Sequence, residues 1–277
     1  MRYISFRRAD GAAAYGRVEG EEVVALGADL KAAIAQGALG RAGDGAGDGN
    51  RLRLADLALL PVIPNPSKIF CVGHNYESHR QETGRAKVEH PSIFTRFADT
   101  LVAHGGEILR PAVSTSLDYE GELAVVIGKG GRGIAEAKAL DHVAGYACFN
   151  DASVRDWQWH TSQFTPGKNF PQTGGFGPWL VTPEEAGDLS DVHVVTRLNG
   201  NVVQDQPIGD MIFPVAKIIA YLSAFTLLSP GDVIATGTPG GVGAKREPPL
   251  WMKAGDRVEV EIGPVGRLVN GVADETR

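Results

Sequence analysis

Short apolar segments separated by turn residues occur along most of the chain. An unbroken apolar run from Leu123 to Ile127 ends at Gly128, and residues 143–149 form a second, mostly apolar run. Runs of this length that end in a turn residue are typical of buried strands. Residues 2–6 largely alternate between polar and apolar positions, as a strand with one covered face does. The pattern predicts a protein made of many short strands.

Two further segments have a clear local structure. Asn199 and Gly200 separate two strand-like segments, and this dipeptide is typical of a two-residue hairpin turn. Residues 215–225 have helical spacing, because their apolar residues recur on one face. These are Ile218, Ile219, Leu222 and Phe225. We also expect a short helix at residues 135–142.

A proline cluster at residues 61–66 predicts a domain boundary. We expect a small N-terminal domain over residues 1–64 and a larger catalytic domain over residues 65–277. Residues 40–50 are rich in glycine, alanine and aspartate, and this composition predicts a loop.

Glu120 and Glu122 stand just before the apolar run of residues 123–127. Residues two apart in an extended chain point to the same face, so the two carboxylates should be neighbours. Two adjacent carboxylates at a buried strand repel each other and are costly to desolvate. A divalent cation with oxygen ligands would compensate them. The alternative is a strand face in contact with solvent.

Other polar residues have two interpretations each. His79 and Glu82 would share one face of a helical turn, as a general base and its orienting partner do, or form a surface pair. Asp151 follows the strand at 143–150 and would either meet the two glutamates or cap a helix. Lys168 lies between turn residues, where it could stabilise negative charge or face solvent.

Two residues are weaker candidates for substrate contact. Arg96 lies within a strand-like segment at 91–97 and would face either an anionic substrate or solvent. Thr238 opens a glycine-rich segment at 238–243, which could present a hydroxyl group and backbone N–H groups to an anion. An ordinary surface turn is the alternative for this segment.

Composition excludes several classes of protein. The chain has 277 residues and a formal net charge of -6, which argues against binding to nucleic acid. No apolar run approaches the roughly 20 residues of a membrane span, and the N-terminus lacks the apolar core of a signal peptide. The two cysteines, Cys71 and Cys148, do not form a disulfide framework and are expected to be buried thiols. We therefore expect a reducing, cytoplasmic setting.

Five motifs in the same order resemble those of the fumarylacetoacetate hydrolase family. Residues 73–82 resemble its Gly-x-Asn-Tyr-x-x-His-x-x-Glu motif, and residues 118–123 resemble its Glu-x-Glu metal strand. Residues 150–156 resemble the third metal motif, residues 167–170 the Gly-Lys loop, and residues 228–238 the late Gly-Asp-Val-Ile-x-Thr-Gly-Thr stretch. Each motif alone is weak, but the five together extend over most of the chain.

The resemblance implies an α+β, mostly β fold: a mixed β-sandwich roll with few helices and a small N-terminal β-rich domain. It implies a homodimer. It also implies that Glu120, Glu122 and Asp151 hold Mg²⁺ or Mn²⁺. A further acidic ligand that some members carry upstream has no counterpart in this sequence.

The resemblance also implies roles for the other candidates. His79 and Glu82 would form a base dyad on a lid, and Lys168 and Thr238 would contact the substrate. Arg96, and Tyr76 within the first motif, are two further candidates for substrate binding.

The expected substrate is a small 2-oxo acid. Our hypothesis is hydrolysis of the C–C bond of an acylpyruvate, of the kind met in aromatic catabolism, through a metal-held enolate. An oxaloacetate-type decarboxylase and a 2-hydroxy-dienoate hydratase or isomerase stay open as alternatives. From a different class, a metal-stabilised binding protein without catalysis would keep the metal site and show no turnover.

Overall fold

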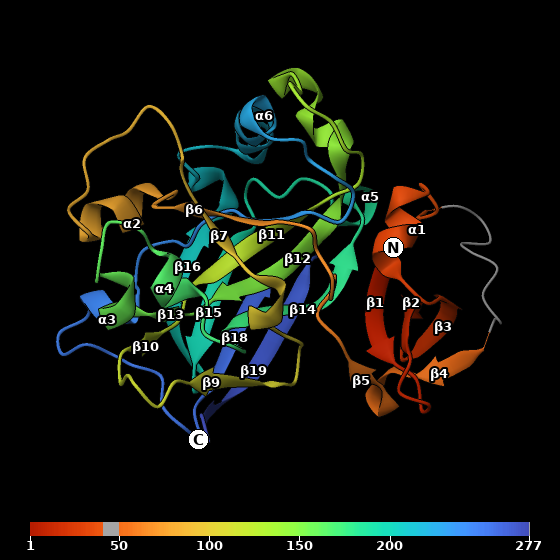
Figure 1. The fold of residues 1–277 in the computed structure, drawn as a ribbon, viewed down its shortest axis with the longest axis horizontal. Helices are drawn as coiled ribbons and strands as arrows, with labels where there is room; N and C mark the ends of the chain where they lie inside the picture. The colour runs from red at the N-terminus through yellow and green to blue at the C-terminus, as the bar shows by residue number, and fades with distance from the viewer. Residues whose placement is uncertain (41–49, 277) are drawn as a thin grey trace.

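The described residues form mostly strands. The computed structural model describes residues 1–40 and 50–276, so most of the loop predicted at 40–50 lies outside the described residues. The described part contains 19 strands, six α-helices and five short 3₁₀ helices. The expected mostly-β class with few helices is confirmed (Figure 1).

One large sheet runs through the molecule in the order β4–β3–β2–β1–β14–β12–β11–β17–β6–β7, with β5 beside β1 and β8 beside β14. Its strands are β4 (Arg51–Arg53), β3 (Glu22–Gly27), β2 (Ala13–Glu19), β1 (Arg2–Arg7), β14 (Gly174–Val181), β12 (Val143–Asp151), β11 (Gly121–Ile127), β17 (Val233–Ala235), β6 (Ile69–Gly73), β7 (Ser92–Arg96), β5 (Ala58–Leu59) and β8 (Leu101–Val102). The central pair, β11 and β12, is antiparallel.

A second sheet of five strands packs on the large one. Its order is β16 (Asn201–Pro207), β15 (His193–Leu198), β18 (Arg257–Ile262), β19 (Gly266–Asp274) and β9 (Glu107–Arg110). Leu123 and Cys148 of the large sheet share one apolar core with Val260, Ile262 and Leu268 of the second sheet. A pair of short strands, β10 (Leu117–Asp118) and β13 (Ser153–Val154), lies next to the start of β11. The two packed sheets form the expected sandwich.

Strand β11 is covered on both faces, which explains its continuous apolar sequence. Ala124 and Val126 pack into a core that includes residues of the N-terminal segment. Val125 and Ile127 point to the opposite face and pack against helix α6. All seven residues of β11 are buried.

The hairpin predicted at Asn199 and Gly200 is confirmed. These two residues connect β15 to β16, and their φ angles are 52° and 81°. Positive φ at both central positions defines the type I′ turn that Asn-Gly favours.

Helix α6 spans Val215–Phe225, as the apolar periodicity predicted, and covers one side of the large sheet (Figure 1). The remaining helices are α1 (Leu30–Ala35), α2 (Glu77–Glu82), α3 (Arg155–Gln158), α4 (Thr165–Lys168), α5 (Pro183–Ala186), η1 (Leu54–Asp56), η2 (Ala98–Thr100), η3 (Glu136–His142), η4 (Ile208–Asp210) and η5 (Gly243–Lys245). Within residues 1–40 and 50–276, none of the helices has both the length and the apolar character needed to cross a membrane.

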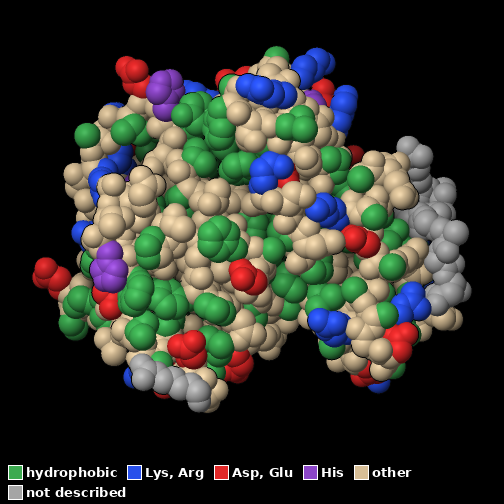
Figure 2. Space-filling model, viewed as in Figure 1, with side chains coloured by type: hydrophobic (Ala, Val, Ile, Leu, Met, Phe, Trp, Pro, Cys, Tyr) green, Lys and Arg blue, Asp and Glu red, His purple; other side chains and the backbone are tan. Residues whose placement is uncertain are grey.

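The N-terminal segment forms a lobe beside the main body (Figure 2). Positive and negative side chains are interspersed over the face shown there. Strand β1 pairs with β14 through Arg2 and Val181 and through Tyr3 and Leu180. Tyr3 also lies in the same apolar core as Phe176 of β14. The large sheet therefore continues from the main body into the N-terminal lobe. The division into domains at residue 64 stays a prediction.

The two thiols are expected to be inert in the folded protein. Both side chains are buried, and burial raises the pKa of Cys148 to about 12. Burial, together with the nearby Asp151 and Glu122 carboxylates, raises the pKa of Cys71 well above its usual value. Because the thiolate is the reactive form, iodoacetamide at pH 8 should label neither cysteine of the native protein and both in 8 M urea. Intact mass measured after alkylation tests this, and rapid labelling of the folded chain would contradict it.

Candidate active site

Three carboxylates from the central strands converge in the structure. Glu120 precedes β11, Glu122 lies within it, and Asp151 ends β12. One oxygen from each lies within 4.8 Å of the others. The side chains are nearly inaccessible, with 5%, 2% and 0% of their residues' surface exposed. The grouping that the sequence suggested is present in the fold.

The antiparallel register of β11 and β12 produces this convergence. Gly121 lies opposite Asn150 in the ladder. The backbone N–H of Asp151 donates to the carbonyl of Glu120 at 2.8 Å, and the backbone N–H of Glu120 donates to the side-chain oxygen of Asn150 at 3.0 Å. The ladder determines which residues lie opposite each other. Glu120 and Asn150 therefore face one another although they are 30 positions apart in the sequence.

Buried cations neutralise two of the three carboxylates. Lys168, at the end of α4, places Nζ 2.7 Å from Glu120 Oε2 and 2.6 Å from Asp151 Oδ2. Arg155 Nη1 lies 2.7 Å from Glu120 Oε1, and Arg96 Nη1 contacts Asp151 Oδ1. Burial by itself would raise the pKa of Glu120, but the charges of Lys168 and Arg155 outweigh it and lower that pKa.

Glu122 has no such cation. Its Oε2 accepts a hydrogen bond from the backbone N–H of Gly237 at 2.8 Å. Among the described residues, no lysine or arginine forms an ion pair with it. Burial and the neighbouring charges of Asp151 and Glu120 raise its pKa well above the usual value.

The three residues therefore offer oxygen donors only, and one of them, Glu122, has no cation of its own. This donor set fits a hard divalent cation. It suits Mg²⁺ and Mn²⁺ alike, so it does not identify the metal.

The proposed His–Glu dyad is formed on α2. His79 Nδ1 lies 2.7 Å from Glu82 Oε1, and Glu82 Oε2 accepts from the backbone N–H of Gly241 at 2.9 Å. His79 is buried, with 5% of its surface exposed. With Nδ1 engaged by the carboxylate, Nε2 is the ring nitrogen left for a substrate.

His74 supports the ring of His79, and sequence reasoning did not single it out. The two rings are stacked, with centroids 5.1 Å apart and planes 10° from parallel. Burial, with a smaller contribution from His79, lowers the pKa of His74 to about 4, so this ring is neutral near pH 7. Its backbone φ of 55° is unusual for a residue other than glycine, which marks a constrained position beside the dyad.

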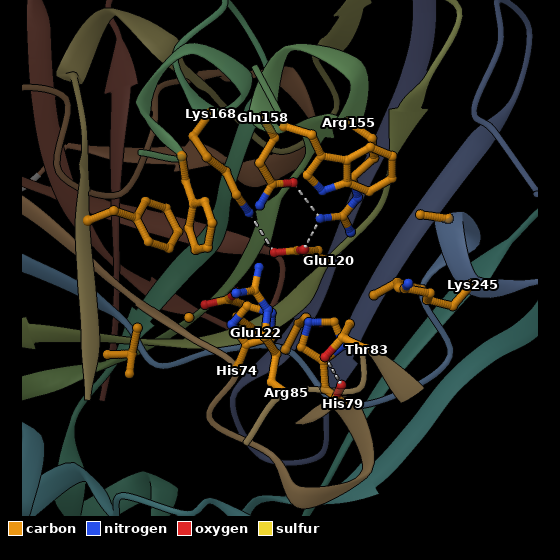
Figure 3. A pocket seen from close by; sticks show the side chains of 18 residues that line it. His74, His79, Thr83, Arg85, Glu120, Glu122, Arg155, Gln158, Lys168 and Lys245 are labelled. Atoms are coloured by element: carbon orange, nitrogen blue, oxygen red, sulfur yellow. Dashed lines mark hydrogen bonds and ion pairs between the residues drawn. The ribbon is translucent and has the colours of Figure 1, made fainter. Parts of the chain in front are cut away.

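These groups line one pocket with a cavity of about 110 Å³ (Figure 3). His79, Glu120, Glu122, Lys168 and Thr238 all contribute to its wall. Phe94, Phe164 and Trp159 supply the apolar part. Acid, base and cation therefore face the same small space.

The three predicted substrate-binding residues lie in different places. Thr238 lines the pocket, but its hydroxyl donates to the carbonyl of Gly121 at 3.0 Å and accepts from Gln204 Nε2 at 2.8 Å. Tyr76 is fully buried in the apolar core, and Arg96 lies against Asp151 with 2% of its surface exposed. Neither of these two lines the pocket, so we propose no direct substrate contact for Arg96 or Tyr76.

Arg155 is a second residue that the sequence analysis did not single out. Its Nε donates to Asp118 Oδ2 at 2.8 Å. Its Nη1 donates to Gln158 Oε1 at 2.8 Å (Figure 3). Asp118 in turn accepts from the backbone N–H groups of Gly243 and Ala244 at 2.8 and 3.0 Å. Arg155 was detectable only as part of the motif at residues 150–156, because its carboxylate partners Asp118 and Glu120 are remote in sequence.

The fold and the pocket together define an enzyme that acts on a small molecule. Residues 68–273 match the family model described as fumarylacetoacetate (FAA) hydrolase C-terminal. The chain belongs to the fumarylacetoacetate hydrolase family, as its motifs indicated.

Two relatives of the chain are named as oxaloacetate tautomerases. The mitochondrial oxaloacetate tautomerase fahd2 of Xenopus laevis is 42% identical over 223 residues, which cover 80% of this chain and 70% of that protein. The oxaloacetate tautomerase YisK of Bacillus subtilis is also 42% identical, over 79% of this chain and 74% of its own length.

Solved structures have the same architecture. The fumarylacetoacetate hydrolase of Exiguobacterium antarcticum is 35% identical with a TM-score of 0.86, and 99% of this chain and 100% of that chain are covered. The maleylpyruvate hydrolase of Sphingobium sp. SYK-6, solved with manganese(II) and pyruvate, is 26% identical with a TM-score of 0.80, and both chains are covered to 100%.

Two isosteric substitutions should separate the roles of the glutamates. Glu122→Gln removes an uncompensated buried charge and should raise the free energy of unfolding of the metal-free protein by about 1 kcal/mol. Glu120→Gln removes the partner of Lys168 and Arg155 and should lower it by about 3 kcal/mol. Both should reduce the increase in melting temperature that Mg²⁺ or Mn²⁺ causes in the unsubstituted protein.

Urea unfolding in a chelator, followed by thermal melts with each metal, measures both quantities. Equal destabilisation by the two substitutions, or unchanged metal stabilisation in both, would contradict this account of the cluster.

Proposed function

We propose that this chain is a divalent-metal-dependent enzyme that interconverts the keto and enol forms of a small 2-oxo acid, with oxaloacetate as the first substrate to test. One observation carries the proposal: His79, whose Nδ1 is held by Glu82, lines the same pocket as Glu120, Glu122 and Lys168. The names of the two oxaloacetate tautomerases that are 42% identical to the chain support this choice.

Glu120, Glu122 and Asp151 would hold the metal. When bound, Mg²⁺ or Mn²⁺ would supply Lewis-acid polarisation of the 2-oxo acid, which makes the adjacent C–H more acidic. The manganese in the solved maleylpyruvate hydrolase supports a metal of this kind.

The dyad would move the proton. Nε2 of His79 takes a proton from the carbon next to the 2-oxo group, and the electron pair of that C–H bond shifts onto the oxo oxygen. Glu82, 2.7 Å from Nδ1, holds the ring in the required tautomer and stabilises the imidazolium. The imidazolium then returns the proton to the oxygen and completes the change from keto to enol.

Lys168 would stabilise the developing negative charge. Its ammonium group is almost fully buried, and Nζ lies over the ring of Phe94 at 5.1 Å from the centroid. Phe94 and Phe164 contact each other and add apolar surface to the pocket wall. A fixed cation in a water-poor site stabilises an anion more than the same cation in water does.

Hydrolysis of an acylpyruvate to pyruvate and a carboxylic acid is the second candidate. The maleylpyruvate hydrolase structure with bound pyruvate favours it, although its identity to this chain is lower, at 26%. The same dyad would instead deprotonate a water molecule, which attacks the distal carbonyl. Lys168 would then stabilise the pyruvate enolate that leaves.

Two expectations rest on the family resemblance or on composition and stay predictions: a homodimer and a cytoplasmic location. The relatives include proteins named as mitochondrial and a bacterial protein, so they favour no single compartment. Light scattering of the purified protein tests the dimer.

His79→Ala should reduce the rate of enol–keto interconversion by about 100-fold or more, because it removes the general base. The rate of the Glu82→Gln variant should lie between that of His79→Ala and that of the unsubstituted enzyme. His193→Ala is a matched control, because His193 pairs with Asp205 on the surface, where both side chains are about half exposed. Its turnover should be unchanged. Turnover close to normal in His79→Ala would remove the base assignment.

The products should identify the reaction. We expect the enzyme with Mg²⁺ or Mn²⁺ to accelerate the interconversion of enol and keto oxaloacetate without forming pyruvate or CO₂, and a chelator to abolish the effect. NMR of reactions with oxaloacetate and with several acylpyruvates measures this directly. Two carboxylic acids from an acylpyruvate would instead establish C–C hydrolysis, and CO₂ from oxaloacetate would establish decarboxylation.

A further inference from the structure

Four cationic side chains from arginine and lysine line the pocket, and they differ in how they are paired. Lys168 and Arg155 are buried and bind carboxylates of the central cluster. Arg85 and Lys245 are exposed, and in the part of the chain that the structure describes no carboxylate forms an ion pair with either. A cation that lines a pocket without a partner is available to an anionic ligand.

We propose that Arg85 is a specificity-determining residue that binds the distal carboxylate of a dicarboxylic 2-oxo acid. The inference rests on the proposed function and makes its substrate class more specific. A substrate whose 2-oxo acid end lies at the acidic cluster and Lys168 directs its other end away from them. Arg85 lies near His74 and His79, across the pocket from Lys168 (Figure 3). A guanidinium group is suited to bidentate recognition of a carboxylate at that end.

The backbone of Arg85 is hydrogen-bonded to α2, the helix that carries the proposed base. Its backbone N–H donates to the carbonyl of Arg80 at 3.0 Å, and its own carbonyl accepts from Arg80 Nη1. Arg80 is held in turn by Glu77, with Nη2 2.6 Å from Oε1. Arg85 is therefore attached to α2 by two hydrogen bonds, although its side chain is exposed. The geometry couples the distal binding group to the same helix as His79.

The effect of Arg85 on the pKa of His74 agrees with a location of Arg85 beside the proposed base. After burial and His79, the charge of Arg85 is the next contribution that lowers the pKa of His74. Arg85 is thus close enough to act on a group that stacks directly on the proposed base.

Lys245 is the competing candidate, on η5 at another part of the rim. The backbone N–H of Lys245 donates to the carbonyl of Val242 at 3.2 Å, so both backbones are held, but its ammonium is a point charge on a flexible stem, whereas Arg85 has a planar fork. The structure therefore favours Arg85.

The test compares oxaloacetate with its 4-monomethyl ester, which keeps the 2-oxo acid and removes the distal charge. Exchange of the C3 protons with deuterium, followed by NMR, gives kcat and KM for both compounds. Arg85→Gln should lower kcat/KM for oxaloacetate by about 10- to 100-fold, mainly through KM, because a charge-assisted hydrogen bond is lost. The same variant should change the value for the ester by less than about 3-fold. Arg85→Lys should recover part of the loss.

Lys87→Gln is the matched control. It removes an equal charge from the same segment, from a residue that does not line the pocket, and it should leave both substrates unaffected. An equal loss for both compounds in Arg85→Gln, no loss for either, or a selective loss in Lys245→Gln alone would overturn the assignment. If the unsubstituted enzyme acted on neither compound, the proposed function itself would fail, which separates that outcome from a failure of the role of Arg85.

Discussion

The structure depends on one group of buried charges where β11 and β12 meet. Four carboxylates and three cations have at most 5% of their residues' surface exposed. They are Asp118, Glu120, Glu122, Asp151, Arg96, Arg155 and Lys168. Four negative and three positive charges leave one negative charge in excess, and Glu122 is the member with no cation of its own. A buried charge that is left unpaired is unfavourable, so this is the place where a bound cation adds most to stability.

The same charges fix the loops around the pocket. Asp118 accepts hydrogen bonds from two backbone N–H groups at residues 243 and 244, and Glu122 accepts one from Gly237. Glu82 does the same for Gly241. Asp118, Glu122 and Glu82 therefore each position part of the segment at residues 237–244. Binding of a metal would affect this segment through Glu122, which is both a proposed metal ligand and the acceptor of the Gly237 N–H.

The sequence predicts those contacts of the site that join residues close together along the chain. The i, i+2 spacing of Glu120 and Glu122 and the i, i+3 spacing of His79 and Glu82 follow from strand and helix geometry, and both pairs come together in the fold. The sequence does not predict the contacts between residues that are far apart along the chain. Arg96 lies 55 positions from Asp151, and nothing in its neighbours distinguishes a buried counter-charge from a substrate contact.

The stacking of His74 on His79 could not be predicted from sequence spacing either. His74 stacks on His79 through a backbone turn with positive φ, which spacing alone does not reveal.

With the proposed chemistry, one site of this kind could start several of the reactions that the relatives' names record. Proton abstraction next to the 2-oxo group and departure of a pyruvate group both place negative charge on the same oxygen, and Lys168, together with a metal held by the acidic cluster, would stabilise it in both reactions. What distinguishes the reactions is the far end of the substrate and whether a water molecule can reach it. In the proposed binding mode, that end would meet the exposed residues Trp159, Arg85 and Lys245 rather than the buried ones. Residues at the rim are under weaker structural constraint than the buried cluster, so reaction and substrate specificity can change there without disturbing the fold.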